Sequence, residues 1–354
     1  MTDATTQRLA PLDYRPKFPA EQCAVAIVGC GTAAKDLHLP AYAAWGVDIA
    51  GVYDPAPAAT DGVRERFPFV RQVYSSLDEL LADPKVTAVD IATQPAERPE
   101  LILRAIDAGK HVLAQKPLAP DLDAAKRVIA AADEKGVRLA VNQNGRWAPQ
   151  WRAATRLIES GAMGRPFAVT HLHDKGLPPL AGTHFDDLDH FVLYDYDVHW
   201  IDISRCWLER DTPVEVRAAD YRTPDQPAEV RNACAAMVEI RYASGANVVI
   251  RTVGDARTAR PGAPFWIHGT EGTIRGSVLL GSEFLELDRD GELTPLELEG
   301  AWFPDGFAGA LGELLSAVAE DREPYNSARH NLLSLELTLA ACRSADRDGA
   351  PVSL

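Results

Sequence analysis

The chain has little of what would tie it to a disulfide framework, a membrane or nucleic acid. Five cysteines are scattered over 354 residues with no CxxC pair, so we expect buried free thiols rather than disulfides or a zinc ribbon. No apolar run reaches the roughly 18 residues of a membrane-spanning helix, and the first twenty residues lack the apolar core of a signal peptide. Lysine and arginine number 36 against 51 aspartates and glutamates. The net charge of −15 argues against nucleic acid and anionic membranes as partners, and together these features predict a cytoplasmic globular protein.

What the chain does have is a glycine turn between a strand and a helix. Residues 24–28 are apolar, as in a strand buried on both faces of a parallel sheet. Gly29 and Gly31 follow and permit a tight turn with close approach of the backbone to a pyrophosphate. Asp54 ends a second strand, where its carboxylate can bind ribose hydroxyls and would repel a 2′-phosphate. The spacing predicts a site for NAD, with NADP possible, formed by Gly29, Gly31, Thr32, Ala33 and Asp54.

Strands and helices continue to alternate as far as residue 141, with helices expected near 36–45 and 58–66 among them, which predicts an α/β fold with a doubly wound parallel sheet of the Rossmann type. Ligands of such sheets bind beyond the carboxyl ends of the strands, and three polar segments fall there. We predict that the cofactor is contacted from these segments by Thr93, Gln94, Pro95, Gln115, Lys116 and Asn144. For each segment a polar loop without a ligand is the alternative.

The pattern changes at residue 148. Strand-like stretches follow at 167–173, 214–221, 235–242, 247–253, 265–268, 272–275 and 284–287, with hairpin turns at 244–245, 269–272 and 290–291. Two helices are predicted near the end of the chain, over 306–320 and 328–346. We therefore expect an N-terminal arm (1–22), a Rossmann domain (23–147) and a C-terminal α+β domain (148–354). The large, mostly antiparallel open sheet of the last domain would cover the nicotinamide or form a subunit interface.

Acid-base chemistry is predicted for a helix near residue 199. Asp195, His199 and Asp202 fall at i, i+4 and i+7, on one helix face. Oxidation of a secondary alcohol needs a base for the hydroxyl proton, and an imidazole suits this role. Lys116 lies at the expected nicotinamide end, where a cation favours the alkoxide. A structural His–Asp pair is the alternative, and the Rossmann context favours catalysis.

These segments together resemble the Gfo/Idh/MocA family of oxidoreductases, which includes glucose-fructose oxidoreductase and inositol dehydrogenase. The resemblance covers about residues 23–345, and its strongest marker is the string from Ala108 to Pro117, AGKHVLAQKP. It implies that Lys116 contacts substrate and nicotinamide ribose, that Asp195 and His199 lie near the reacting carbon, and that His199 is the acid-base residue. The activity it implies is hydride transfer between NAD(P) and a secondary alcohol of a sugar, inositol or related polyol, with no metal.

The chain departs from the family pattern at three positions. Gln115 stands where the family usually has Glu. Arg98 stands where a His often follows the family's TP motif, and Asp197 stands where Gly is common. We therefore expect unusual substrate selection at Asp197. Arg146, Trp147 and His171 are further candidates for substrate binding, with structural roles as the alternative.

Two rival functions remain open, and so does a metal site. The rivals are an NAD-assisted glycosidase or lyase that recycles its cofactor, and a nucleotide-dependent sugar sensor without catalysis. The histidine-rich segments 171–174 and 184–190 could supply metal ligands, but we favour a strand end followed by a polar loop. A homo-oligomer, a dimer or tetramer through the C-terminal sheet, is expected.

Overall fold

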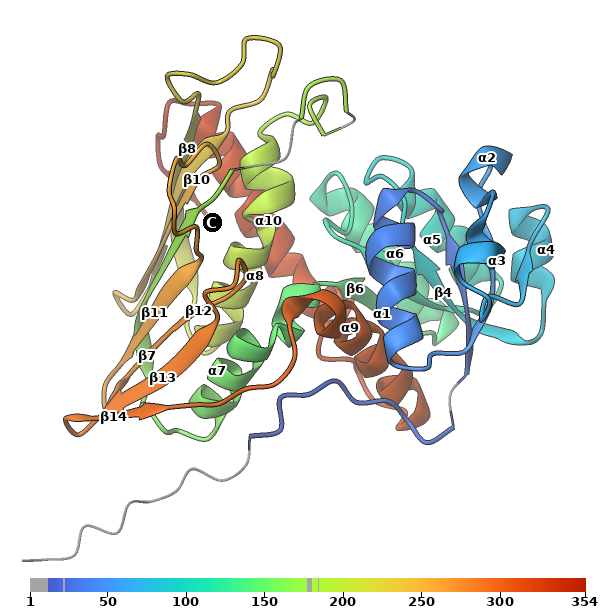
Figure 1. The fold of residues 1–354 in the computed structure, drawn as a ribbon, viewed down its shortest axis with the longest axis horizontal. Coiled ribbons are helices and arrows are strands. Elements are labelled where there is room, and N and C mark those ends of the chain that lie inside the picture. Colours follow the sequence, from blue (N-terminus) through green and yellow to red (C-terminus); the bar gives the residue numbers. More distant parts are fainter. Residues whose placement is uncertain (1–11, 22, 177–179, 184) are drawn as a thin grey trace, which may run out of the picture.

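Two β-sheets lie side by side, and helices α9 and α10 pack between them (Figure 1). The structure is a computed structural model that describes residues 12–21, 23–176, 180–183 and 185–354. Both the parallel N-terminal sheet and the mostly antiparallel C-terminal sheet confirm the predicted fold class. Within the described residues no helix is long and apolar enough to cross a membrane.

The first sheet has six parallel strands in the order β3-β2-β1-β4-β5-β6. Its strands are β1 (Ala24–Val28), β2 (Ile49–Tyr53), β3 (Gln72–Val73), β4 (Val86–Ile91), β5 (His111–Gln115) and β6 (Leu139–Asn142). The helices between them are η1 (Ala34–His38), α1 (Leu39–Ala44), α2 (Pro57–Thr60), α3 (Val63–Arg66), α4 (Leu77–Ala82), α5 (Arg98–Asp107) and α6 (Leu122–Lys135). The chain reverses its strand order between β1 and β4, so the carboxyl ends of these strands border the crevice where such sheets bind ligands.

Two local expectations for this half differ from the structure. The helix predicted near 58–66 is broken into α2 and α3, because Gly62 between them has a left-handed backbone with φ of +69°. The helix after the glycine turn starts before Asp36 and contains a π-helical segment, η1. Such segments insert one extra residue into a helical turn and are frequent at functional sites.

The second sheet has nine strands in the order β14-β13-β12-β11-β7-β10-β9-β8-β15. Its strands are β7 (Pro166–Asp174), β8 (Pro213–Tyr221), β9 (Ala235–Tyr242), β10 (Asn247–Val253), β11 (Pro264–Gly269), β12 (Thr273–Ser277), β13 (Phe284–Arg289), β14 (Glu292–Pro295) and β15 (Val352–Ser353). All pairs are antiparallel except β7 with β10. The three predicted hairpins are confirmed as β9–β10, β11–β12 and β13–β14.

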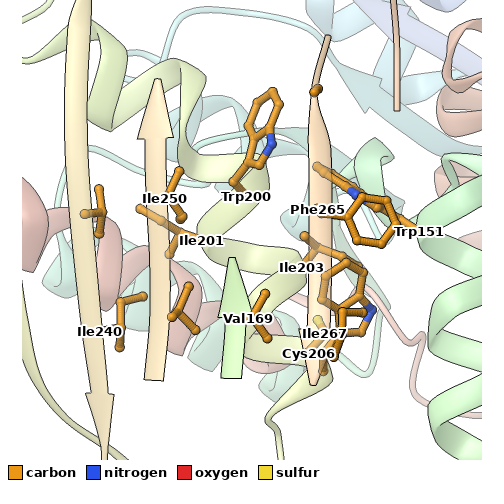
Figure 2. Packing of buried hydrophobic residues seen from close by; sticks show 14 of the residues in the cluster. Trp151, Val169, Trp200, Ile201, Ile203, Cys206, Ile240, Ile250, Phe265 and Ile267 are labelled. Atoms are coloured by element: carbon orange, nitrogen blue, oxygen red, sulfur yellow. The ribbon is translucent and has the colours of Figure 1, made fainter. Parts of the chain in front are cut away.

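Among the described residues, helices cover only one face of this second sheet (Figure 1). The remaining helices are η2 (Asn144–Trp147), α7 (Pro149–Glu159), η3 (Val192–Tyr196), α8 (Val198–Trp207), α9 (Trp302–Ala319) and α10 (Ala328–Ala345). Trp200, Ile201 and Ile203 of α8 pack against Val169, Ile240, Ile250, Phe265 and Ile267 of the sheet (Figure 2). This apolar contact positions α8, which carries His199, against the rigid sheet.

Helices α9 and α10 pack against both halves of the molecule. Phe307, Leu311 and Leu314 of α9 share a buried cluster with Val25 and Ile27 of the first sheet. Ala328 and Leu335 of α10 join the core on the other side of that sheet. The Rossmann half is therefore completed by residues beyond position 300, although the boundary at 147 remains a prediction.

Candidate active site

The glycine turn after β1 has room for a ligand on one side only. Gly29 has φ of +96°, and a Cβ there would lie 2.7 Å from the carbonyl oxygen of Ala92, so no larger residue fits. A Cβ at Gly31 would meet no atom within 4 Å. Gly31 and Thr32 are exposed and Ala33 is half-buried, so the turn leaves room for a pyrophosphate at Gly31, as the NAD site requires.

Asp54 lies over this turn at the end of β2. Its Oδ2 accepts a hydrogen bond of 2.8 Å from the backbone nitrogen of Cys30, and its Oδ1 accepts one of 2.9 Å from Ala56. The carboxylate is thereby held beside the glycine turn, where the adenosine ribose is expected. Arg66 on α3 forms an ion pair with Asp36 at 2.9 Å. This arginine, which could otherwise favour NADP by binding its 2′-phosphate, therefore already has an acidic partner.

One arginine joins the two loops that follow β4 and β5. The buried guanidinium of Arg98 donates to the carbonyl oxygens of Thr93 and Pro117. Burial lowers the pKa of Arg98 to about 10, so it still carries its charge near neutral pH. The loop with exposed Gln94 and the loop with Lys116 are thereby held together, and Arg98 does this from the position where the family often has His.

Lys116 reaches across to the segment that precedes α8. Its Nζ lies 2.6 Å from the backbone oxygen of Asp195 and 2.9 Å from Asp195 Oδ1. Asp195 belongs to η3, a second π-helical segment. Residues 79 positions apart are therefore in direct contact, with both side chains mostly buried, which strengthens their charge interaction.

His199 lies one helical turn beyond Asp195, beside Trp302. The two rings meet edge to face, with centroids 5.3 Å apart, and His199 Nδ1 is buried with no hydrogen-bond partner in the described part of the chain. Burial, with the charge of Lys116, lowers the pKa of His199 well below its usual value, and Asp202 opposes this shift only in part. The imidazole is therefore neutral at physiological pH, which is the form a general base needs, but the same burial and the charge of Lys116 make it a weaker base than a free histidine.

Asn144 is linked to the same tryptophan. The indole Nε1 of Trp302 donates a hydrogen bond of 2.7 Å to Asn144 Oδ1, and Asn144 Nδ2 donates to the backbone oxygen of Asn142 at 3.3 Å. Trp302 thus connects the loop after β6 with His199. Sequence reasoning did not identify Trp302, because nothing in the local pattern near residue 302 points to a site 100 residues earlier in the chain.

Asp197 is fully buried between α8 and the sheet. Its Oδ1 accepts a hydrogen bond of 2.6 Å from Thr252 Oγ1, and its Oδ2 has no partner among the described residues. Burial raises the pKa of Asp197 to about 7, although the Thr252 hydrogen bond acts in the opposite direction. The side chain does not reach the surface, so its expected substrate contact remains a prediction.

Three other substrate candidates lie in structural surroundings. Arg146 is buried and donates to both oxygens of Asp202, at 2.7 and 2.6 Å. Although burial alone would raise the pKa of Asp202, this pairing lowers it to about 2. Trp147 is buried with Arg152 over its ring. His171 is buried, bonded to Ser204 Oγ at 3.0 Å and stacked on Trp207.

All three side chains make core contacts in this structure, and their role in substrate binding remains a prediction. Asp202 likewise belongs to the Arg146 ion pair. Asp195 lies in η3 and His199 and Asp202 lie in α8, and the pattern 195–199–202 did not show that Asp202 has a separate partner.

The histidine-rich segments do not assemble into a cluster. Among the described residues no three His, Cys, Asp or Glu side chains gather as metal ligands would. His173 accepts or donates one hydrogen bond of 2.7 Å with Tyr196, and His190 lies between Asp220 and Asp346. His184, which the segment 184–190 includes, lies outside the described residues.

The sheet, the glycine turn with Asp54, and the contact of Lys116 with Asp195 beside a neutral histidine define a dinucleotide-binding oxidoreductase. The chain belongs to the Gfo/Idh/MocA family. Residues 23–143 match its oxidoreductase domain with the NAD-binding Rossmann fold, and residues 151–275 match its C-terminal domain. The resemblance seen in the sequence is thereby confirmed.

Similar proteins include several sugar oxidoreductases. A 1,5-anhydro-D-fructose reductase of Ensifer adhaerens is 30% identical over 90% of this chain and 95% of its own length. A D-apiose dehydrogenase of Paraburkholderia graminis is 29% identical over 93% and 89%. The fold matches that of an Agrobacterium radiobacter oxidoreductase solved with NAD⁺, L-tartaric acid and magnesium, with a TM-score of 0.82, 24% identity and coverage of 94% and 98%.

Proposed function

We propose that the protein transfers a hydride between NAD and the carbon of a secondary alcohol in a sugar, inositol or related polyol. The observation that carries the proposal is the contact of Lys116 with Asp195 beside the neutral imidazole of His199, at the carboxyl end of the parallel strands. The sugar reductase and dehydrogenases among its relatives support the substrate class.

NAD supplies the hydride acceptor or donor when bound, with Gly31 to Ala33, Asp54 and the loops after β4 and β5 as its expected contacts. His199 accepts the hydroxyl proton during oxidation and returns it during reduction. The Lys116 ammonium donates a hydrogen bond to the reacting oxygen and stabilises its negative charge. Asp195 holds that ammonium in place through two oxygens.

The test is an assay of purified protein with NAD and NADP across inositols, aldoses and sugar acids, followed by nicotinamide absorbance. With a substrate found, Lys116→Ala and His199→Ala should each lower turnover by about 100-fold or more, while Lys126→Ala, on the exposed face of α6, should not. Wild-type rates in both site variants would overturn the assignment.

The rivals make a different prediction in the same assay. Recycling of NAD within a glycosidase or lyase would give product without net change in nicotinamide absorbance. A sensor would bind NAD and sugar with no product. Chromatography of the sugars detects product formed without a net change in nicotinamide absorbance, and calorimetry detects binding of NAD. Together they distinguish the two rivals from an enzyme whose substrate is not in the panel.

We further propose that copies of the chain associate through the face of the second sheet that no helix covers. The apolar side chain of Met237 is 50% exposed there, and Ala219 and Arg251 are its neighbours across the strands. A cytoplasmic location stays a prediction.

A further inference from the structure

A chain of hydrogen bonds runs from a buried carboxylate to the backbone of Lys116. The Lys116 nitrogen donates to Gln115 Oε1 at 2.7 Å, and Gln115 Nε2 lies 3.0 Å from His38 Nε2. His38 Nδ1 lies 2.7 Å from Asp90 Oδ2, which also accepts from Tyr42 at 2.6 Å. The five groups come from β5, η1, β4 and α1 and meet at the carboxyl end of the sheet.

The direction of every hydrogen bond follows from one group. A backbone N–H can only donate, so Gln115 must present its oxygen to Lys116 and its amide nitrogen to His38. His38 Nε2 must then accept, which leaves its proton on Nδ1, directed at Asp90. His38 is therefore a neutral imidazole of a single tautomer, because a second proton on Nε2 would face the amide N–H of Gln115.

Buried side chains surround His38 and Asp90 in this chain of hydrogen bonds. His38 and Asp90 are completely buried. Tyr42 is a further titratable group that contacts His38, and burial together with the charge of Asp90 raises the pKa of Tyr42 well above its usual value, so its hydroxyl remains a donor. From α9 the ring of Phe307 packs on His38 with ring centroids 4.7 Å apart, so an apolar side chain covers the imidazole from that helix.

We propose that Gln115 is a positioning residue for Lys116, locked by His38 and Asp90, and that the amide makes this support independent of pH. The effect of Gln115 on turnover rests on the proposed function, whereas the tautomer of His38 does not. An amide cannot titrate, and neither His38 nor Tyr42 needs to gain or lose a proton for the chain of hydrogen bonds to hold. Gln115, where the family usually has Glu, thus fixes the loop that aims the Lys116 ammonium at Asp195.

Gln115→Glu tests this directly because the two side chains have the same shape. One carboxylate oxygen would still accept from Lys116, but the other would face the lone pair of His38 Nε2. The new carboxylate and His38 Nε2 then need one additional proton to form a hydrogen bond, and this proton is lost as the pH rises. The ratio of variant to wild-type kcat should therefore fall by about tenfold or more between pH 6 and pH 9. A ratio that does not change with pH overturns the proposal.

Gln115→Met removes the hydrogen bonds while keeping most of the volume. It should lower kcat by about 10- to 100-fold at every pH with a smaller change in KM, because Lys116 loses its aim rather than its charge. Thermal unfolding and NAD affinity, measured in parallel, identify a variant that fails to fold. A folded Gln115→Met protein with wild-type kcat contradicts the positioning role.

The tautomer of His38 is measurable without any substrate. Long-range proton–nitrogen correlation spectra of histidine-labelled protein, assigned with His38→Asn, should show a proton on Nδ1 and an unprotonated Nε2 from pH 6 to pH 9. A proton on Nε2 at pH 7 overturns the proposal even if no substrate is ever found, and the expected tautomer with no turnover would count against the proposed function alone.

Discussion

Asp54 is the side chain that we expect to select the cofactor. Its two carboxylate oxygens accept hydrogen bonds from the backbone nitrogens of Cys30, in the glycine turn, and of Ala56, after β2, so the negative charge has one fixed place. Asp54→Ala should weaken NAD binding by about tenfold, the value of one charge-assisted hydrogen bond. NADP binding should change less or improve, because the repulsion of its 2′-phosphate is gone.

Titration calorimetry with both nucleotides measures this change. Asp107→Ala is a suitable control, because Asp107 is an exposed acid on α5 in the same domain. Unchanged affinity of Asp54→Ala for both nucleotides would remove Asp54 from the site.

Asp197 is expected to make the stability of the fold depend on pH. Its folded pKa of about 7 lies above the ordinary value of 3.8, so between these values the folded state binds a proton that the unfolded state has lost. Stability therefore falls as pH rises through this window, by at most about 4 kcal/mol. Asp197→Asn keeps an acceptor for Thr252 and removes the titration.

Urea unfolding at several pH values checks this sign. The Asn variant should match wild type near pH 4 and exceed it in stability at pH 8. A difference that stays constant over the whole range would show that Asp197 keeps its charge in the folded protein.

At the scale of elements, Arg98 at the start of α5 ties together the loops that follow two neighbouring strands. Arg98→Lys can satisfy one of the two carbonyl oxygens and Arg98→Met neither, since only a guanidinium has the fork to reach both. We expect Arg98→Met to lower the free energy of unfolding by about 2–4 kcal/mol, with a smaller loss for Arg98→Lys. Urea unfolding measures both, and equal stability of the two variants would contradict the role of the two hydrogen bonds.

The helices α9 and α10 show what an element contributes far from its neighbours in sequence. Both were predicted as helices, but their partners are the Rossmann core and the inner face of the second sheet together. The tip of α9 supplies Trp302, which contacts His199 and Asn144. Apolar periodicity predicts a helix and a buried face, not which face of which sheet it will cover.

At the scale of the whole molecule, we expect copies of the chain to form a homo-oligomer through the uncovered face of the second sheet. Met237→Lys places a charge on that face and should shift the protein to smaller species in size-exclusion chromatography with light scattering. Glu134→Lys, on the exposed surface of α6, should leave the association unchanged. A monomeric wild-type protein, or an oligomer that Met237→Lys does not weaken, would place any interface elsewhere.

The sequence by itself determined the features that depend on local order along the chain. Alternating strands and helices, the glycine turn, Asp54 at the end of β2 and the three hairpins all follow from residue type and spacing over short stretches. Lys116, Asp195 and His199 were also singled out, because strand ends and helix faces have fixed positions in a parallel sheet and in a helix, and because the family motif marks them; their catalytic roles remain predictions.

Only the tertiary structure decided which polar residues meet. Arg146 pairs with Asp202, 56 positions away, and His38 with Asp90, 52 positions away. An acid within the apolar strand β4 was the one local sign of that second pair. Spacing along the chain predicts neighbours within an element, whereas contacts between elements depend on how buried faces pack. For this reason the sequence did not show that Arg146 and His171 are buried, or that Gln115 has a partner in a helix 77 residues earlier.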